Sequence, residues 1–305
     1  MEKVFVLLST YNGEKFLSRQ LDSILGQSGV DVRLMVRDDG STDNTVALLK
    51  RYARENSNMS VFLGENVGYI KSFMWLVNNC PCVSKAYYAF SDQDDFWLPE
   101  KLLSAVEMLQ QTDSSLPACY YSDLDVVDAE ENFIRKANAW EGKIDKYMLS
   151  VFIGIRGCTM VYNDALQRLL APIQVGEISG HDTYVALVAF WLGTVVYDNR
   201  SYILYRQTGS NLSITSTNPL DHLLKNFDYL SRRLGPRSNI HEKNAREVLR
   251  NYEAVYPDKL AELRAVALYR ESLGKRFHLI FDSKFKSFSP IIRLFNDVLI
   301  LLGKL

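Results

Sequence analysis

The 305-residue chain is 47% hydrophobic and 23% charged, a composition that excludes a disordered protein and provides for one large domain plus an appendage. Its formal net charge of −1 excludes an overall electrostatic attraction to nucleic acid, so any anionic partner must be recognised locally. The four cysteines are scattered, with one Cys-Pro-Cys pair and no second pair to complete a zinc site, and are expected to be reduced and mostly buried.

Short apolar runs alternate with helical patterns through the first hundred residues, which predicts βαβ units that feed a parallel sheet. Strands are expected at 4–8, 32–36, 61–63 and 86–90, and helices at 14–25, 43–55 and 73–78. Polar clusters follow these strands. Because open α/β sheets bind ligands at the carboxyl ends of their strands, the clusters are expected to converge there.

The pattern is less uniform in the second half of the chain. A helix is expected at 99–113, a strand at 118–122, an irregular polar stretch at 123–150, a helix at 182–191 and a strand at 194–197, followed by a polar run that begins at Tyr205. From about residue 218 onward the pattern is helical and richer in Lys and Arg. The apolar run at residues 4–8 is too short for a signal-peptide core, which favours a cytoplasmic location.

The first polar cluster, Ser9-Thr10-Tyr11-Asn12-Gly13, lies where the first strand stops, so Tyr11 is placed to stack on a base. The second, from Arg37 to Asp43, places Asp38 and Asp39 to accept hydrogen bonds from a base or a ribose. Each cluster has a structural alternative, namely an ordinary turn with helix-capping residues.

Asp92-Gln93-Asp94-Asp95 is the sharpest local signal. Carboxylates at alternate positions after a strand can converge on one point, and oxygen ligands are preferred by Mg²⁺ or Mn²⁺ that also bridges phosphates. A solvated acidic turn is the alternative, although three carboxylates in four residues repel one another unless a cation lies between them. His181-Asp182 opens a helix, where Asp182 is either a capping residue or a general base.

Five segments, taken in chain order, resemble glycosyltransferase family 2, the inverting enzymes with a GT-A fold. They are Ser9-Thr10-Tyr11-Asn12-Gly13, Asp38-Asp39-Gly40-Ser41-Thr42-Asp43, Asn66-Val67-Gly68, Ser91-Asp92-Gln93-Asp94-Asp95-Phe96-Trp97 and His181-Asp182. The resemblance spans roughly residues 3–212. The Ser-Asp-Gln-Asp-Asp-Phe-Trp form and the Tyr205-Arg206-Gln207 run look most like bacterial rhamnosyltransferases that build cell-surface polysaccharides.

The resemblance implies a Rossmann-like, mostly parallel sheet flanked by helices, and it implies roles for single residues. Asp182 would be the base, and Asp92 and Asp94 would hold Mg²⁺ or Mn²⁺. Acceptor residues would be Trp97, Gly157, Cys158 and His181. The nucleotide sugar would be bound by Thr10, Tyr11, Glu14, Asp38, Asp39, Asn66, Gly68, Lys71, Asp92 and Gln93. Related sequences often have a histidine where this chain has Thr208, so metal preference is expected to differ here.

The expected organisation is a catalytic domain over residues 1–215 and a helical region over 216–305. Within the first, residues 1–98 would bind the nucleotide sugar and residues 99–215 the acceptor. In the second, Lys and Arg alternate with Phe after residue 274, and Pro290 opens an amphipathic helix that is interrupted by charges and too short to span a bilayer. That helix would lie at the inner face of the membrane, against the catalytic domain, or in a homo-oligomer.

These features predict transfer of a sugar, with L-rhamnose from dTDP-rhamnose as the expected donor, onto a saccharide or polyprenyl-linked saccharide. One alternative keeps the reaction and changes the donor to a UDP-hexose or UDP-N-acetylhexosamine. Another is a nucleotide-binding module that has lost catalysis. A dinucleotide oxidoreductase is disfavoured because no Gly-x-Gly-x-x-Gly follows the first strand.

Overall fold

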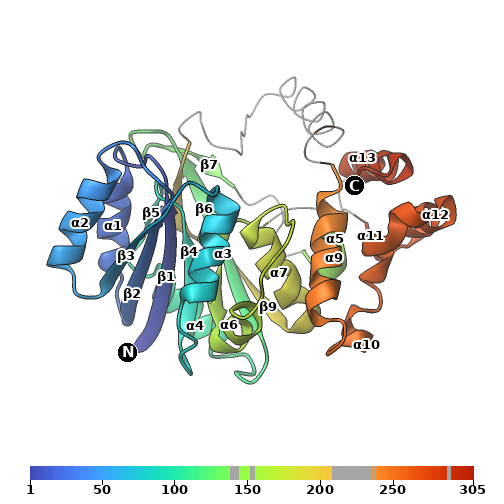
Figure 1. Ribbon diagram of the computed structural model, residues 1–305, viewed down its shortest axis with the longest axis horizontal. Helices are drawn as coiled ribbons and strands as arrows, with labels where there is room; N and C mark the ends of the chain where they lie inside the picture. Colours follow the sequence, from blue (N-terminus) through green and yellow to red (C-terminus); the bar gives the residue numbers. More distant parts are fainter. Residues whose placement is uncertain (138–143, 152–154, 208–234, 236–237, 287–289) are drawn as a thin grey trace. The chain divides into compact units, whose positions relative to one another are not determined.

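The computed structural model describes residues 1–137, 144–151, 155–207, 235, 238–286 and 290–305. The chain forms two compact units (Figure 1). The first unit contains Met1–Gly142, Ile155–Gln174 and Gly193–Thr208, and the second contains Lys143–Gly154, Val175–Leu192 and Gly209–Leu305. The boundary expected at residue 215 lies outside the described residues.

The first unit is built on one mixed sheet. Its strands are β1 (Glu2–Thr10), β2 (Val30–Asp38), β3 (Met59–Leu63), β4 (Tyr87–Ser91), β5 (Phe96–Trp97), β6 (Ala118–Val127), β7 (Phe133–Lys136), β8 (Val161–Asn163) and β9 (Thr194–Arg206). They lie in the order β3-β2-β1-β4-β8-β6-β9-β5, with β7 on β6. Strands β1 to β4 are mutually parallel, β8 is antiparallel to both of its neighbours, and β6 and β9 are parallel again.

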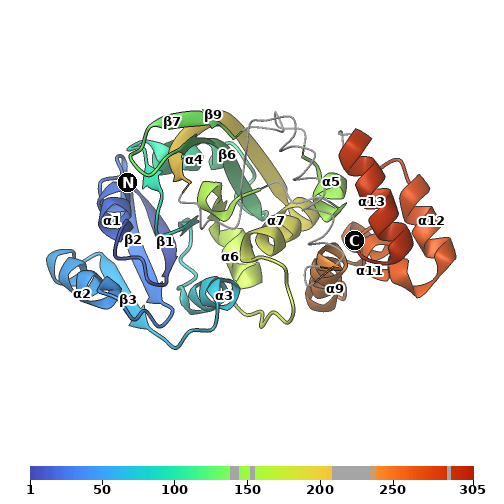
Figure 2. The ribbon, with the colours of Figure 1, turned by 90° about the horizontal axis from the view of Figure 1, so that it is seen from above.

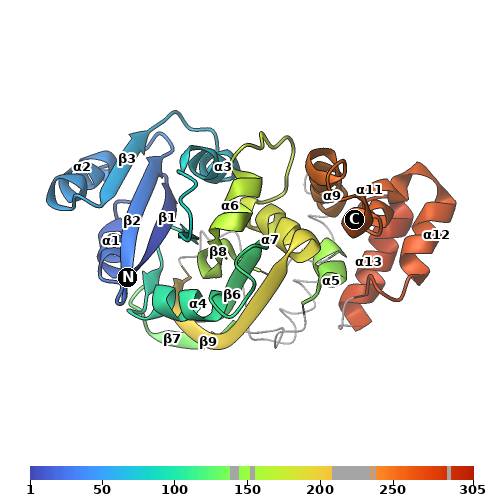
Figure 3. The same ribbon diagram turned by 90° about the horizontal axis from the view of Figure 1, so that it is seen from below.

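Helices cover both faces of this sheet. Residues of α1 (Leu17–Leu25), α2 (Thr45–Glu55) and α4 (Lys101–Leu109) share one buried core with alternate residues of β1 and β2. On the other face, α3 (Tyr69–Asn79) packs on β1, and α6 (Asp164–Leu170) packs on β4 and β8. Figures 2 and 3 show α1 and α2 on one side of β1 to β3 and α3 on the other. The expected fold class is therefore confirmed.

Aromatic side chains fill the α3 face. The rings of Phe5 and Tyr88 stack at 5.4 Å between centroids, and those of Tyr88 and Tyr162 at the same distance. Phe73 of α3 meets Phe90 edge to face. Successive side chains of a strand point to opposite faces, so β1 contributes Phe5 here and Val4 and Val6 to the other core.

The second unit is helical. It contains α5 (Lys146–Val151), α7 (His181–Leu192), α9 (Ile240–Tyr252), α10 (Pro257–Leu260), α11 (Arg264–Leu268), α12 (Leu273–Phe281) and α13 (Pro290–Leu302), with a 3-10 turn, η2, at Tyr269–Glu271. Helix α7 is buried on nearly all sides. Lys259 Nζ donates to the Leu192 carbonyl at the end of α7 at 2.8 Å, and Trp191 Nε1 donates to Ser150 Oγ at 3.0 Å. The predicted helical C-terminal region is confirmed for the described residues.

Two expectations about the second half were wrong. Strand β6 continues to Val127 through a stretch expected to be irregular, and β9 continues to Arg206 through the start of the expected polar run. The two strands pair with each other along most of their length, with interruptions near Ser122 and Asp123. The buried Asp198 side chain is accommodated in β9 because it accepts hydrogen bonds from the Tyr120 hydroxyl and the Arg200 guanidinium. No described helix combines the length and the apolar character needed to span a bilayer.

Candidate active site

Three strand ends bring the predicted clusters to one edge of the sheet. Strand β1 lies between β2 and β4, with Thr10 opposite Asp38 and Leu8 opposite Ser91. The loops that follow these strands therefore emerge side by side, as expected for parallel strands.

Gln93 joins the acidic loop, which is formed by residues 92–95 after β4, to the loop after β1. Its Oε1 accepts hydrogen bonds from Thr10 Oγ1 at 2.6 Å and from the Tyr11 N–H at 2.9 Å. Its Nε2 donates back to the Tyr11 carbonyl at 3.2 Å. The side chain of Tyr11 is left 45% exposed, so a ring suited to stacking lies beside the acidic loop.

The loops after β1 and β2 are also tied together. Asn12 adopts a left-handed conformation (φ 48°), and its Oδ1 accepts a hydrogen bond from the Thr42 N–H at 2.8 Å. The Asn12 N–H donates to Ser41 Oγ at 2.9 Å. The Glu14 carboxylate accepts from the Asn44 N–H at the start of α2 at 2.8 Å. Glu14 thus braces the second loop.

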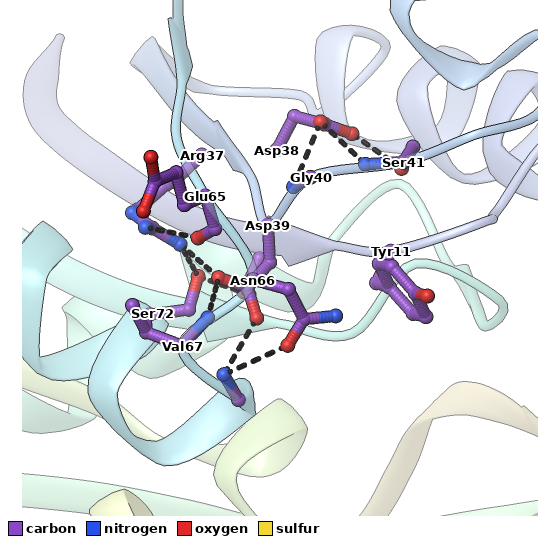
Figure 4. A network of polar contacts seen from close by, with 12 residues as sticks. Tyr11, Arg37, Asp38, Asp39, Gly40, Ser41, Glu65, Asn66, Val67 and Ser72 are labelled. Atoms are coloured by element: carbon purple, nitrogen blue, oxygen red, sulfur yellow. Dashed lines mark hydrogen bonds and ion pairs between the residues drawn. The ribbon is translucent and has the colours of Figure 1, made fainter.

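Asp38 closes a tight turn of its own. Its carboxylate accepts hydrogen bonds from the Gly40 N–H at 3.1 Å, the Ser41 N–H at 2.9 Å and Ser41 Oγ at 2.5 Å (Figure 4). The residue is 2% exposed. The turn considered as a structural alternative is therefore present, and it fixes the carboxylate at the end of β2.

Asp39 and Arg37 form a buried ion pair. The pair holds the third loop, which follows β3 and contains residues 64–68. Asp39 accepts hydrogen bonds from the Val67 N–H at 3.0 Å and the Gly68 N–H at 2.9 Å. Arg37 donates to Ser72 Oγ at 3.0 Å and to the Glu65 carbonyl at 3.1 Å. Figure 4 shows the pair at the centre of this network.

The third loop presents three predicted residues to solvent. Asn66, Gly68 and Lys71 are all exposed, and the Asn66 amide points toward the Tyr11 ring in Figure 4. Gly68 has a φ of +84°, a conformation that favours glycine at the start of α3. The structure thus brings Asn66 and Tyr11 to the same side of the strand-end loops.

The acidic loop becomes more buried along its length. Asp92, Gln93 and Asp94 are partly exposed, whereas Asp95 is 1% exposed. Burial, reinforced by the charges of Asp92 and Asp94, raises the pKa of Asp95 well above its usual value. The Arg206 backbone and the Cys158 thiol oppose that rise, and no hydrogen bond of ordinary geometry from the described residues reaches either carboxyl oxygen.

Arg206 supports the acidic loop from β9. It is 3% exposed, and its Nε donates to the Asp94 carbonyl oxygen at 3.1 Å. Its Nη2 contacts Glu131 at 2.9 Å, and its guanidinium lies 4.7 Å from the centre of the Phe16 ring. Burial raises the pKa of Asp94, and the positive charge of Arg206 opposes that rise.

The loop fits a divalent cation. Among the described residues, Asp92, Asp95 and Cys158 each offer a ligand atom, and these atoms lie within 4.8 Å of one another. A bound cation would stabilise the ionised form of the buried Asp95 carboxyl group. Asp94 is outside this group of three, and its proposed role as a ligand stays a prediction.

A buried lysine, Lys101, interacts electrostatically with Cys158 and with Asp95 of the acidic loop. Lys101 is 1% exposed, and its Nζ is 3.6 Å from the centre of the Trp97 ring. Burial lowers the pKa of Lys101 to about 7, and Cys158 and Asp95 oppose the shift. Trp97, predicted at the acceptor, is itself 1% exposed and packs in the core beside α1 and α4. Sequence reasoning passed over Lys101, although a lysine in the apolar stripe of a predicted helix was a usable signal.

The remaining predicted residues lie in different parts of the chain. Gly157 and Cys158 form a buried 3-10 turn, η1 (Gly157–Thr159), in the first unit. His181 and Asp182 begin α7 in the second unit, where Asp182 Oδ1 accepts a hydrogen bond from the Thr183 N–H at 2.7 Å. Burial lowers the pKa of His181 to about 4. Thr208 lies outside the described residues.

Solved structures share this architecture. TarS from S. aureus in complex with UDP-GlcNAc matches with a TM-score of 0.58 at 18% identity, over 93% of this chain and 78% of that one. The mannosyltransferase PcManGT from Pyrobaculum calidifontis, in complex with GDP-Man and Mn²⁺, matches with a TM-score of 0.50 at 16% identity, over 99% and 85%. At such identities the likeness establishes the fold alone.

Curated relatives are glycosyltransferases. The chain is 32% identical to the dTDP-rhamnosyl transferase RfbG of Shigella flexneri over 38% of its own length and 40% of the relative's. It is 26% identical to the UDP-Glc:alpha-D-GlcNAc-diphosphoundecaprenol beta-1,3-glucosyltransferase WfgD of Escherichia coli over 74% and 85%. An uncharacterized glycosyltransferase of Nostoc is 28% identical over 50% and 45%. The chain thus spans less than half the length of RfbG and of the Nostoc relative.

The family assignment rests on the N-terminal half of the chain. The family model for glycosyl transferase family 2 matches residues 5–170, more than half of the 305 residues. That range contains the loops after β1, β2 and β3, the acidic loop after β4, and Cys158. The chain therefore belongs to glycosyl transferase family 2.

Proposed function

We propose that the chain is a metal-dependent, inverting hexosyltransferase that moves L-rhamnose from dTDP-rhamnose onto a saccharide during polysaccharide synthesis. The observation that carries this proposal is the link made by Gln93, which ties the backbone of Tyr11, whose side chain is exposed, to the acidic loop. A nucleotide sugar has an aromatic base at one end, the sugar at the other end, and a diphosphate between the ribose and the sugar. Groups suited to the base and to the diphosphate are spaced along one sheet edge here.

The chain's residues would divide the chemistry between them. Tyr11 would stack on the base, and Asp38, Asp39 and Asn66 would surround the nucleoside. Asp92 and Asp94 would hold Mg²⁺ or Mn²⁺, which neutralises charge on a departing diphosphate when bound. Asp182 would take the proton from the acceptor hydroxyl, whose oxygen then bonds to the anomeric carbon as the bond to the diphosphate breaks on the opposite face.

The donor is chosen on the likeness to RfbG, described as a dTDP-rhamnosyl transferase. Two findings favour a second candidate, a UDP-hexose or UDP-N-acetylhexosamine. WfgD is described as using UDP-Glc and is matched over most of its length, and the TarS structure holds UDP-GlcNAc. A third candidate, a nucleotide-binding module without catalysis, predicts binding without release of nucleoside diphosphate.

A donor panel separates these candidates. The protein would be incubated with dTDP-rhamnose, UDP-glucose and UDP-N-acetylglucosamine, each with Mg²⁺ or Mn²⁺, and released nucleoside diphosphate would be measured with and without saccharide acceptors. Preferential release of nucleoside diphosphate from dTDP-rhamnose supports the proposal. Preferential release from a UDP-sugar would show that the UDP-sugar is the donor instead. Binding with no release from any donor, with or without acceptor, would leave the non-catalytic module.

Asp182 has a matched control within its own unit. Asp258 also lies in the first turn of a helix, α10. Asp182→Asn should keep donor binding and lower transfer by at least about a hundredfold, the low end of general-base contributions. Asp258→Asn should leave transfer unchanged. Equal transfer by the two variants would remove Asp182 from the proposed role.

We further propose that the acceptor side of the reaction lies at an anionic membrane surface on the cytoplasmic side, with a polyprenyl-linked saccharide as acceptor. Helices α12 and α13 pack against each other, and each has an exposed apolar stripe. The stripes are Leu273, Phe277 and Phe281 on α12, and Leu294, Val298, Leu301 and Leu302 on α13. Residues 272–305 carry six Lys or Arg and two Asp, a net charge of +4, whereas the whole chain carries −1.

Apolar side chains beside basic ones fit an anionic lipid surface. Phe277→Gln/Phe281→Gln should reduce sedimentation with vesicles that contain phosphatidylglycerol. Phe133→Gln should not, although Phe133 of the first unit is also exposed. Sedimentation unchanged by the double substitution would contradict the proposal. A stable dimer that the double substitution dissociates would assign the stripes to a second copy of the chain.

A further inference from the structure

The sulfur atom of Cys158 lies close to two carboxylates of the acidic loop. Cys158 Sγ lies within 4.8 Å of a carboxyl oxygen of Asp92 and of one of Asp95. Three atoms no more than 4.8 Å apart have a central point at most about 2.8 Å from each, and metal–sulfur and metal–oxygen bonds to zinc are about 2.3 and 2.1 Å long. Small side-chain movements would therefore bring all three atoms to bonding distance of one ion.

Burial points to an ion as the missing partner. Asp95 is 1% exposed, and both of its carboxyl oxygens lack an ordinary hydrogen bond from the described residues. Cys158 is also 1% exposed. Asp92 is partly exposed, which gives an ion a route from solvent to the two buried ligands. An isolated buried carboxylate is strongly unfavourable unless a cation compensates it.

The charges around this group are incomplete without a cation. Asp92, Asp94 and Asp95 contribute three negative charges when ionised, and Lys101 is a buried cation whose electrostatic partners include Cys158 and Asp95. Its Nζ also lacks a hydrogen bond from the described residues. A bound cation would offset negative charge that Lys101 alone does not balance.

We propose that Cys158 Sγ and the carboxylates of Asp92 and Asp95 form a site for a thiophilic divalent ion such as Zn²⁺, for which Cd²⁺ is a spectroscopic probe. On binding, the S–H bond of Cys158 breaks, a metal–sulfur bond forms, and the proton passes to the buffer. Thiolates favour zinc and similar ions, whereas carboxylates alone favour Mg²⁺ and Mn²⁺. The proposal rests on the metal role proposed above for the acidic loop, and it adds a sulfur ligand.

The proposal has a functional consequence. Because Asp92 would be shared, a thiophilic ion held by Cys158 would exclude Mg²⁺ or Mn²⁺ from the loop. Micromolar Zn²⁺ should then inhibit transfer supported by Mg²⁺. Cys158→Ser should relieve that inhibition, since a serine hydroxyl is a poor ligand for zinc.

The test is titration of the full chain with Cd²⁺ in a Cys82→Ser background, because Cys82 is the exposed cysteine among the four. Wild-type Cys158 should give an ultraviolet absorption band from a thiolate–cadmium bond and release a proton. Cys158→Ser should remove the band and weaken Cd²⁺ binding by at least about tenfold, while Mg²⁺ binding changes less than about twofold. Asp95→Asn should weaken Cd²⁺ binding and keep the band.

Cys119→Ser is the matched control, because Cys119 is an equally buried thiol of the same unit on β6. This variant should keep both the band and the affinity. A band that survives Cys158→Ser, or a protein with no band at all, would overturn the inference. If Mg²⁺-supported transfer persists without any Cd²⁺ band, the inference fails and the proposed function stands. If a Cys158-dependent band is present but no donor supports transfer, the metal site stands and the proposed function fails.

Discussion

Arg206 Nε donates a hydrogen bond to the carbonyl oxygen of Asp94 at 3.1 Å, so the last residue of β9 supports the acidic loop that follows β4. The same guanidinium contacts Glu131, and Glu131 in turn pairs with Arg19 at 3.0 Å. Segments from three parts of the chain thus hold one loop. A loop that must present carboxylates to a charged ligand gains precision from such support.

Arg206→Lys should weaken Mn²⁺ binding and lower kcat/KM by about tenfold to a hundredfold, the usual effect of removing a group that supports a metal ligand. Lysine keeps the charge, but it cannot donate in several fixed directions to Asp94, Glu131 and the Ala129 carbonyl. Isothermal titration with Mn²⁺ and steady-state kinetics would measure the two effects.

Arg200→Lys is the control for that substitution. Arg200 lies on the same strand and pairs with Asp198, but its side chain is 60% exposed. The Arg200→Lys variant should bind Mn²⁺ with the same affinity as the unchanged protein. Equal losses in the two variants would mean that β9 tolerates lysine poorly in general and that Arg206 has no special effect on the loop.

Gly13→Ala should lower affinity for the nucleotide sugar. A Cβ at residue 13 would lie 2.5 Å from Gln93 Oε1 and 2.8 Å from Thr10 Oγ1, so the Gln93 amide would have to leave Tyr11. We expect at least a tenfold rise in the dissociation constant of the nucleoside diphosphate, measured by fluorescence or calorimetry. Gly274→Ala is the control, since its Cβ would approach nothing closer than Ser272 Oγ at 3.8 Å. Unchanged nucleotide binding by Gly13→Ala would argue against the role given to Gln93.

The strand-end clusters could be predicted from the sequence because each begins where an apolar run stops. Thr10, Asp38 and Ser91 are the last residues of β1, β2 and β4, within two residues of the predicted ends. Parallel order then places the loops on one edge. The acidic loop was found in the same way, because three aspartates in four residues are unusual after a buried strand.

Other features depend on contacts between distant residues and have no local pattern. The sequence shows no sign that the Asp39 carboxylate contacts Arg37 and the N–H groups of Val67 and Gly68. Residues 123–127 begin a stretch that is polar as a whole and resembles a loop, but β6 and β9 satisfy each other's backbone there. The position of Cys158 beside Asp92 and Asp95 likewise arises when chain segments more than sixty residues apart meet.

Asp39→Asn should lower the free energy of unfolding by about 3 kcal/mol, because it leaves the Arg37 charge buried without its partner. Both side chains of that pair are nearly inaccessible, at 7% and 3%. Asp31→Asn breaks the Arg33–Asp31 pair on the same strand, where 44% and 33% of the side chains are exposed, and it should change stability by less than about 1 kcal/mol. Urea denaturation would compare the two. Similar small effects would show that Arg37 finds other partners.

His181 should make the stability of the protein fall in mild acid. Burial lowers the pKa of His181 from 6.5 to about 4 in the folded chain, and the nearby Asp182 opposes that shift only in part. Between these two values the unfolded chain binds a proton at this residue and the folded chain does not, so the free energy of unfolding decreases as pH falls. Above pH 6.5 the residue is neutral in both states and contributes no such dependence.

The change is measurable with a single substitution. From pH 7 to pH 5 the contribution of His181 amounts to a loss of about 2 kcal/mol. His181→Gln removes the titrating group, so the difference in unfolding free energy between the unchanged protein and this variant should shift by that amount in favour of the variant. Any packing defect in the variant is independent of pH and cancels in the comparison. Parallel pH dependences in urea denaturation would show that His181 titrates alike in the folded and unfolded chains.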